Sequence, residues 1–150
     1  MPSHTESRLV PYTADLMYQV VSGVEKYPQF LPWCLALRVL SRERVDERDV
    51  LRAEMLVGFG ALRERYISRV ILDAAARTVD VTHIEGPFKE LDTHWRFTPE
   101  GENCRADFSI VFEFKNRLLG VVAGNAFAHV QMKMTDAFEA RARALSENLA

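Results

Sequence analysis

The C-terminal stretch Leu118 to Asn148, LLGVVAGNAFAHVQMKMTDAFEARARALSEN, decides how the rest of the chain is interpreted. Successive residues of an α-helix are about 100° apart, which puts apolar side chains on one stripe of this stretch and charged side chains opposite. The stripe contains Gly120, Ala123, Phe127, Val130, Met134, Ala137, Phe138 and Leu145. One amphipathic helix is therefore predicted, roughly 45 Å long at 1.5 Å per residue. Only an extended partner such as a sheet can cover its apolar face.

The stripe is uneven along its length. Gly120 and Ala123 are small, whereas the side chains from Phe127 onward are bulky. Small residues that face a sheet leave volume. We therefore expect residues 127–145 to fill the core, and the turns around residues 120–126 to form the wall of a pocket near Trp95 and Phe112.

The chain before this helix has the pattern of β-strands. Alternating apolar residues predict strands at 35–44, 50–59, 62–72, 78–84, 89–98 and 104–115. Turn residues separate them: Asp46-Glu47, Gly58 with Gly60, Gly86-Pro87 and the segment from Pro99 to Glu102. Asn116 is placed to cap the long helix. Because strands do not alternate with helices, the sheet is predicted to be an antiparallel meander.

The N-terminal part adds one strand and short helical segments. Residues 3–10 alternate weakly and predict a first strand, and Thr13 is a candidate N-cap for a short helix that ends near Val24. In YPQFLPWC, residues 27–34, two prolines exclude a regular helix although the segment is apolar. Two interpretations of Phe30 and Trp33 stay open: a plug that holds this segment on the sheet, or a lid that contacts a bilayer.

Composition limits the class of protein. A chain of 150 residues with no visible repeat or linker is expected to form a single domain, residues 1–150. The net charge of −2 argues against general polyanion binding. Cys34 and Cys104 belong to no CxxC or Cys/His cluster, so two buried thiols are expected rather than zinc or a disulfide.

Targeting and membrane signals are not visible in the sequence. The first residues lack the basic and apolar regions of a signal peptide, and the least polar run, residues 118–130, is too short to cross a bilayer. We expect a cytoplasmic protein, with peripheral contact to the inner membrane as one option.

Three segments carry a resemblance to a known family. YPQFLPWC at residues 27–34, EGPFKELDTHWRF at 85–97 and FEFKNRLLG at 112–120 are similar to the coenzyme Q-binding, START-like (polyketide cyclase/dehydrase, helix-grip) family, and the resemblance covers nearly the whole chain. It implies an α+β helix-grip fold: a curved antiparallel sheet of about seven strands around a long C-terminal helix, with short helices between strands 1 and 2. It also implies a cavity that binds a polyisoprenoid quinone such as ubiquinone. Some bacterial relatives resemble ribosome-association toxins, and this second function stays open.

Alternation along the strands gives the residues that face such a cavity. Ala53, Met55 and Phe59 share one face of their strand, and Glu64, Tyr66 and Ser68 share one face of the next. A quinone has two carbonyl acceptors, so Tyr66 and His83 are candidate donors; alternatively, Tyr66, His83 and Glu64 satisfy one another in an ordinary core. The predicted ligand-binding set is Phe30, Trp33, Met55, Phe59, Tyr66, His83, Trp95, Phe112, Gly120, Ala123 and Phe127.

The opposite sheet face is rich in arginine. Its basic residues are Arg38, Arg42, Arg44, Arg52, Arg63, Arg65 and Arg69. One interpretation is a solvated face with ion pairs to Glu43, Asp46 and Glu47. The other is docking to anionic lipids or ribosomal RNA, with Arg38, Arg52, Arg63, Arg65 and Arg69 as the contacts.

These patterns favour binding over catalysis. The chain has no phosphate loop, nucleophile elbow or HExxH motif, and no pair of histidines has metal-ligand spacing. We expect no enzyme, no metal and no required cofactor, with ubiquinone or another prenylated lipid as the bound ligand in support of respiration. Ribosome association that interferes with subunit joining is the alternative, and a polyketide cyclase using Tyr66, His83 and Glu64 ranks third.

Overall fold

The computed structural model describes residues 3–59 and 62–149. The strands are β1 (Ser3–Val10), β2 (Cys34–Val45), β3 (Arg48–Phe59), β4 (Leu62–Asp73), β5 (Thr78–Glu85), β6 (Phe88–Glu100) and β7 (Asn103–Phe114). The helices are α1 (Ala14–Ser22), the 3-10 helix η1 (Val24–Gln29), α2 (Arg117–Met132) and α3 (Met134–Leu149). Each of the seven predicted strands is present, within a few residues of its predicted bounds.

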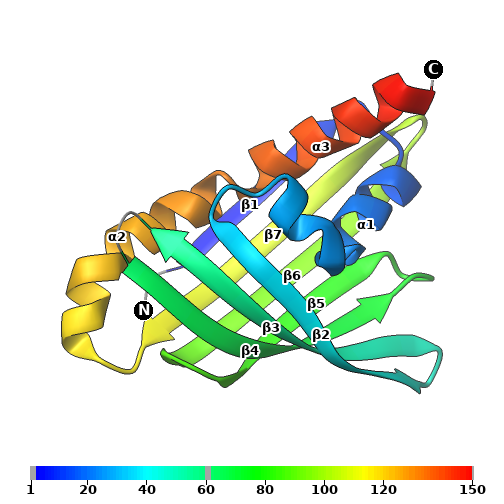
Figure 1. The fold of residues 1–150 in the computed structure, drawn as a ribbon. Coiled ribbons are helices and arrows are strands. Elements are labelled where there is room, and N and C mark those ends of the chain that lie inside the picture. Colours follow the sequence, from blue (N-terminus) through cyan, green and yellow to red (C-terminus); the bar gives the residue numbers. More distant parts are fainter. Residues whose placement is uncertain (1–2, 60–61, 150) are drawn as a thin grey trace.

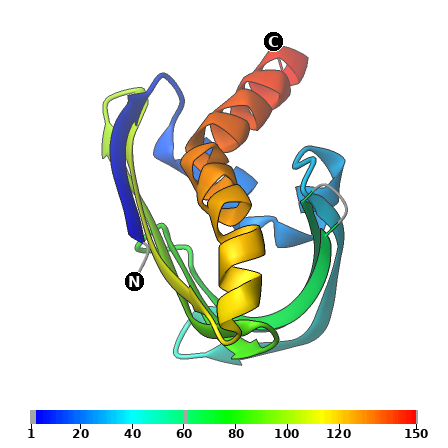
Figure 2. The same cartoon turned by 90° about the vertical axis from the view of Figure 1, so that its left-hand side faces the viewer.

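The strands form one antiparallel sheet that curves around the C-terminal helices (Figure 1, Figure 2). Its order is β1-β7-β6-β5-β4-β3-β2, so β2 to β7 form a meander and β1 pairs with the last strand. Bulges interrupt the register within β2, between Ile67 and Ser68, and between Phe88 and Glu90. Such bulges bend a strand and increase its twist. The predicted α+β helix-grip fold and antiparallel meander are confirmed.

Local sequence explains the ends of several elements. Asp46 and Glu47 both have positive φ (51° and 66°) in the two-residue β2–β3 hairpin, as a type I′ turn requires. The Thr13 hydroxyl accepts a hydrogen bond from the Leu16 backbone N–H at the start of α1. Asn116 caps α2 by accepting from the backbone N–H groups of Leu118 and Leu119. These three predictions are confirmed, whereas Gly60 of the next predicted turn lies outside the described residues.

The apolar faces of β6 and β7 meet the helices as predicted. Ala106, Phe108, Ile110 and Phe112 of β7 are all buried. Trp95 of β6 stacks on Phe108 with ring centroids 4.2 Å apart, and Phe138 of α3 packs edge-on against Trp95 at 5.2 Å. Aromatic pairs of this geometry add about 0.5–1.5 kcal/mol beyond the area they bury. This cluster fixes α3 over the centre of the sheet.

The prediction of one continuous C-terminal helix is wrong, because the helix is interrupted at Lys133. The Lys133 backbone N–H is shared between the carbonyl groups of His129 (3.2 Å) and Val130 (3.1 Å), which is a tightened turn that ends α2. The apolar stripe continues through the interruption, with Val130 on one side and Met134 on the other. The 3.6-residue period therefore could not reveal it, since periodicity reports which face is buried and not whether the axis is straight.

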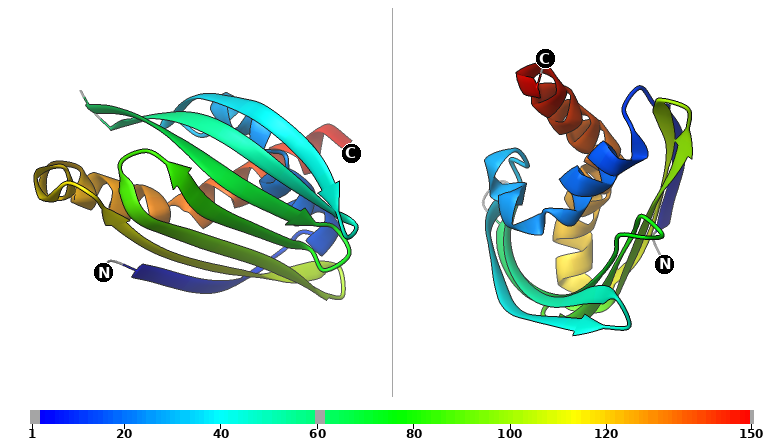
Figure 3. Two further views of the ribbon diagram at one scale, coloured as in Figure 1. Left: turned by 90° about the horizontal axis from the view of Figure 1, so that it is seen from below. Right: turned by 90° about the vertical axis from the view of Figure 1, so that its right-hand side faces the viewer.

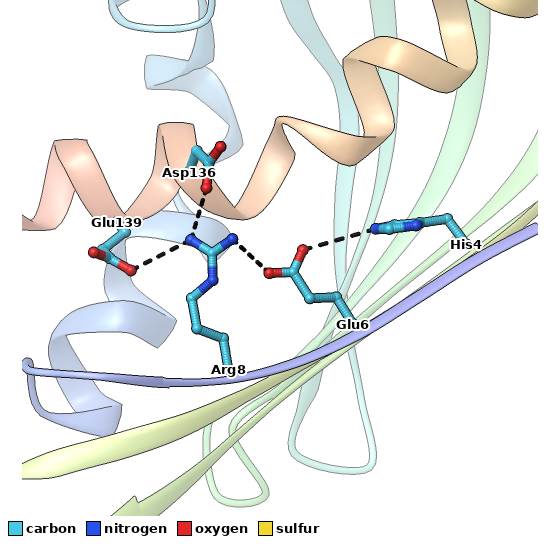
Figure 4. Close-up of polar contacts among 5 residues, drawn as sticks. All are labelled: His4, Glu6, Arg8, Asp136 and Glu139. Carbon is cyan, nitrogen blue, oxygen red and sulfur yellow. Dashed lines mark hydrogen bonds and ion pairs between the residues drawn. The ribbon is translucent and has the colours of Figure 1, made fainter.

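An ion-pair network ties the start of α3 to the edge strand β1 (Figure 4). The Arg8 guanidinium lies 2.8 Å from an Asp136 carboxylate oxygen, 3.4 Å from a Glu139 oxygen and 2.6 Å from a Glu6 oxygen. His4 extends the network to Glu6 at 3.7 Å. Asp136 and Glu139 thus anchor α3 from the polar side while Phe138 anchors it from the core.

Candidate functional site

A cavity lies between the sheet and the α2–α3 junction. It consists of three lobes of about 40, 60 and 80 Å³, and Tyr27, Met55 and Tyr66 line all three. One lobe reaches Trp33 near the chain segment that follows η1, and another reaches Trp95 in the centre of the sheet. Sites for drug-sized ligands usually measure about 300–1,000 Å³. The three lobes are therefore too small to hold a drug-sized ligand in this structure.

The cavity wall is apolar except at a few groups. The Tyr66 hydroxyl donates to the Met55 sulfur at 3.3 Å, a weak acceptor. The Ser68 hydroxyl is buried without a partner. The Gln131 side chain of α2 is only 5% exposed, and its amide has no hydrogen-bond partner within residues 3–59 and 62–149. A buried polar group without a partner costs about 1–3 kcal/mol.

Two tyrosines of the cavity differ in what their hydroxyl groups do. The Tyr27 hydroxyl donates to the Val21 carbonyl oxygen of α1, and its ring packs on Phe138 at 5.3 Å. Burial raises the pKa of Tyr27 and of Tyr66, so both phenols stay neutral. The Tyr27 hydroxyl therefore has a structural role. The Tyr66 hydroxyl could instead donate to a ligand oxygen, which is a better acceptor than the Met55 sulfur.

Five of the residues predicted to bind a ligand line the cavity: Trp33, Met55, Tyr66, Trp95 and Phe127. The other predicted residues whose side chains are described lie elsewhere. Phe112 is buried behind Phe127, with ring centroids 4.6 Å apart. Phe30 lines a separate surface groove of about 240 Å³, where the Arg141 guanidinium lies 5.1 Å from its ring. The side chain of Phe59, the last residue of β3, lies outside the described part.

The pocket wall expected at residues 120–126 is found farther along the chain. Helix residues of the cavity wall run from Phe127 to Phe138, while Ala123 is 1% exposed and touches no lobe. Rings fill the space beneath the small residues: Phe88 and Phe114 stack at 4.8 Å, and a Cβ on Gly120 would lie 3.9 Å from the Phe114 Cβ. The small side chains are compensated by large ones on the sheet, which a single helix pattern does not show.

His83 does not lie on the wall of these lobes. Its ring packs edge-on against Phe88 at 5.4 Å, and its centroid is 6.4 Å from that of Tyr66. Burial lowers the pKa of His83, the Gly86 backbone offsets part of this shift, and neither ring nitrogen makes a hydrogen bond of normal geometry. No hydrogen bond or ion pair joins Glu64 to Tyr66 or His83 in the described chain. The acid–base group expected for a cyclase is therefore not assembled.

Sequence reasoning missed Gln131, Tyr27 and Met134. A signal for Gln131 was available, because residues 127, 131, 134 and 138 follow the helical spacing of a buried stripe. A polar side chain at such a buried position is expected to form a hydrogen bond within the protein or to bind a ligand. Nothing in the sequence pattern distinguishes Tyr27 from an ordinary core residue.

The outer face of β2, β3 and β4 carries the predicted arginines. Arg38, Arg42 and Arg44 pair with Glu54, Glu25 and Asp49 at 3.0–3.3 Å, so the expected partners Glu43, Asp46 and Glu47 were wrong. Arg52 and Arg69 lie directly opposite each other on β3 and β4. No ion pair of Arg52, Arg65 or Arg69 is found in the described part of the chain.

The cysteines and the helices add two further observations. Cys34 and Cys104 are free and buried, and burial raises the pKa of each thiol to about 11. Within the described ranges, no group of three or more His, Cys, Asp or Glu side chains could hold a metal ion. None of the described helices is both long and apolar enough to span a membrane.

Comparison with known proteins places the chain in a family. The sequence pattern of the polyketide cyclase / dehydrase and lipid transport family matches residues 10–139. The chain belongs to this family. The expected resemblance is thereby confirmed.

Two kinds of relative stand out within the polyketide cyclase / dehydrase and lipid transport family. The ribosome association toxin RatA of Escherichia coli K12 is 35% identical over 144 residues, which cover 95% of this chain and 88% of RatA. The mitochondrial coenzyme Q-binding protein COQ10 homolog B of Xenopus laevis is 34% identical over 143 residues, covering 93% of this chain and 57% of that protein.

Solved structures agree with the helix-grip fold of this family. An 18 kDa protein of Caulobacter crescentus shares 37% identity and a TM-score of 0.80, with 98% of this chain and 99% of that chain covered. The Zhui aromatase/cyclase of Streptomyces sp. R1128 has a TM-score of 0.72 at 20% identity, with 95% and 93% covered. The second likeness concerns the fold alone.

Proposed function

We propose that this protein binds a polyisoprenoid quinone, or a similar long apolar molecule with a carbonyl head group, in the cavity beneath the α2–α3 junction. The observation that carries the proposal is the set of poorly paired polar groups on an otherwise apolar wall. Within residues 3–59 and 62–149 the Gln131 amide makes no hydrogen bond, and the Tyr66 hydroxyl donates to the Met55 sulfur. Both are donors, and a quinone supplies two carbonyl acceptors.

The apolar wall fits the remainder of such a ligand. The residues around the two donors are aromatic or aliphatic, among them Trp33, Trp95, Phe127 and Met134. An isoprenoid tail gains about 25 cal/mol for each Å² of apolar surface that leaves water. Binding of this kind needs no reaction, and the name of the coenzyme Q-binding relative supports a quinone as the ligand. The role we propose is that of a carrier or chaperone in respiration, located in the cytoplasm.

The cavity must widen to take a quinone. Met55 lines all three lobes and Met134 lines two of them. Methionine is unbranched and has three rotatable side-chain bonds, so it adapts to a new neighbour at low cost. Rotation of these two side chains would join the lobes without moving the sheet.

The two tryptophans of the chain make this proposal measurable, because both line the cavity. Titration with a short-chain ubiquinone is expected to quench tryptophan fluorescence saturably in wild type and in the Trp33→Phe and Trp95→Phe variants. An isoprenoid alcohol of equal length serves as the control for binding through the tail alone. Absence of saturable quenching, or loss of it in Trp33→Phe only, would count against a ligand in the interior.

Ribosome association is a second candidate, favoured by the arginines of the outer face. Two like charges directly opposite each other on neighbouring strands are destabilising. Arg52 and Arg69 have this arrangement, and neither pairs with a carboxylate among the described residues. A polyanion such as ribosomal RNA would relieve the repulsion. The relatives named RatA support this candidate.

Salt titration of ribosome co-sedimentation tests the second candidate. The Arg52/Arg65/Arg69→Ala variant is expected to reduce the slope of log affinity against log salt by about 2–3, since each phosphate contact contributes about 0.7–0.9. The matched control is Arg38/Arg42/Arg44→Ala, which removes arginines that already have partners. Equal slopes for the two variants would argue that these three arginines have no role in ribosome binding.

A further inference from the structure

The outward face of α2 carries several exposed apolar side chains, with the exposed polar residues Asn125 and His129 between them. Leu118 is 70% exposed, Val121 77%, Val122 63% and Met132 56%. The opposite side of the helix buries Ala123, Phe127, Val130 and Gln131, so apolar side chains occur on both sides of α2. A helix on the surface of a globular protein normally carries polar side chains outward.

The neighbouring helix shows what an ordinary outward face looks like in this protein. Asp136, Glu139, Arg143 and Glu147 mix both signs of charge along α3. By contrast, residues 115–135 contain no Asp or Glu at all, while Lys115, Arg117 and Lys133 are exposed at the two ends of α2. The Lys and Arg residues that border the exposed aliphatic side chains along the helix are therefore not offset by any acidic residue of this segment.

The position of α2 leaves this face accessible. Its N-terminal turns project beyond the ends of the neighbouring strands (Figure 3, left). The Lys115 backbone N–H donates to the Pro87 carbonyl oxygen at 2.8 Å, which fixes the start of α2 to the β5–β6 turn. Apart from the adjoining backbone of α2 itself, no atom of the described residues lies within 4 Å of the position where a Cβ on Gly124 would stand, so that side of the helix is also open.

We propose that the outward face of α2, formed by Leu118, Val121, Val122 and Met132 with Lys115, Arg117 and Lys133, docks on an anionic lipid bilayer. Aliphatic side chains enter the boundary of the acyl region while lysine and arginine bind the lipid phosphates. RNA would use the cations and leave the aliphatic row in water. A second copy of the chain would need an interface of roughly 20–30 residues a side, whereas this row has four apolar members on one helix.

This docking surface is distinct from the cavity, and its test does not depend on the ligand. Ligand-free protein is sedimented with vesicles of phosphatidylcholine containing phosphatidylglycerol, and with vesicles of phosphatidylcholine alone. Wild type is expected to bind the anionic vesicles only, and more weakly as salt increases. Failure to bind quinone would leave this result unchanged, so the two proposals fail separately.

Two variants and a matched control locate the contact. Val121→Asp is expected to weaken anionic vesicle binding by at least about tenfold, because it puts a carboxylate into the row. Lys115→Gln with Arg117→Gln is expected to weaken binding by roughly 20- to 30-fold at low salt. Ala144→Asp places the same charge on the exposed face of α3 and is expected to change binding by less than about twofold.

Each outcome decides the proposal. Binding of Val121→Asp that equals that of wild type, or no binding of wild type to anionic vesicles, would overturn it. Sedimentation velocity on the same samples tests whether a second copy of the chain binds this face instead. If wild type self-associates, Val121→Asp does not, and neither binds vesicles, the face is an interface between two copies and the membrane proposal is wrong. Circular dichroism confirms that each variant is folded.

Discussion

At the scale of single residues, the cavity is defined by polar groups that the core does not satisfy. Alternation along the strands predicted that Met55, Tyr66 and Trp95 face inward, and the structure agrees. Gln131 could not be found in the same way, because the stripe was built from apolar residues alone. His83 shows a different limit: alternation predicts which face of the strand a side chain is on, but not that the His83 ring packs against Phe88 and lines none of the three lobes.

The Gln131 side chain is expected to lower the free energy of unfolding and to increase the affinity for a quinone. Gln131→Leu replaces an amide that makes no hydrogen bond within the described residues, on a side chain only 5% exposed, so the free energy of unfolding should rise by about 1 kcal/mol or less. The same change removes a hydrogen bond to the ligand carbonyl, so the affinity for a short-chain ubiquinone should fall about tenfold. Urea unfolding and the tryptophan quenching titration measure the two effects.

Tyr66→Phe is the companion variant for this test. Its hydroxyl donates only to the Met55 sulfur, so little stability should be lost while affinity again falls. A Gln131→Leu protein that is less stable than wild type would show that the amide has a structural partner, and unchanged affinity in both variants would remove these residues from the binding site.

At the scale of elements, the strands were predicted closely and the C-terminal helix was not. Strand positions follow from an alternation of two and from turn residues such as Asp46-Glu47, which act locally. The interruption at Lys133 is set by packing: Phe127 is held by Phe112, and Phe138 by Trp95, at two places on a curved sheet. No proline or glycine marks it, so the sequence carries no local signal.

The two faces of α2 should respond differently to larger side chains. Gly124→Ala meets open space and should stabilise the protein by about 0.5–1 kcal/mol through helix propensity. Ala123→Phe, one residue away, is 1% exposed in wild type and should destabilise the protein by about 1–3 kcal/mol or more through overpacking. Thermal unfolding followed by circular dichroism measures both. Little loss of stability in Ala123→Phe would instead support the pocket wall first expected at residues 120–126.

At the scale of the whole molecule, one fold accommodates three functions, and only its sites distinguish them. The helix-grip fold could be predicted from the order of the strands and from one amphipathic stretch. Both can be recognised from the periodic spacing of apolar residues. The size of the cavity could not, because it depends on how Phe88, Phe112 and Phe114 fill the space under small helix residues. The proposed quinone site and the proposed ribosome contact lie on opposite faces of the same sheet, so the two proposals do not exclude each other.

The charge of His94 should make stability depend on pH. His94 lies between Asp80 (2.5 Å) and Asp92 (3.0 Å), and the hydrogen bond to Asp80 raises the pKa of His94 above its ordinary value. The folded state then holds the proton more tightly than the unfolded state. This contribution is fully present below about pH 6.5 and is lost as the pH rises through the folded pKa.

A His94→Gln variant isolates this contribution. It should have a lower urea midpoint than wild type near about pH 6 and an equal one near about pH 9. His83 acts in the opposite direction, because burial lowers the pKa of His83 and stability falls as the pH drops below about 6.5. Comparison of His94→Gln with wild type cancels the His83 effect. The same difference at both pH values would mean that the charge of His94 contributes nothing.

The most direct test of a quinone carrier is the lipid content of the protein purified from the cells that produce it. Native mass spectrometry, followed by solvent extraction and identification of the released molecule, measures that content. The account predicts a prenylated quinone at close to one molecule per chain, reduced in Gln131→Leu. Protein that carries no apolar molecule and sediments with ribosomal subunits would contradict it.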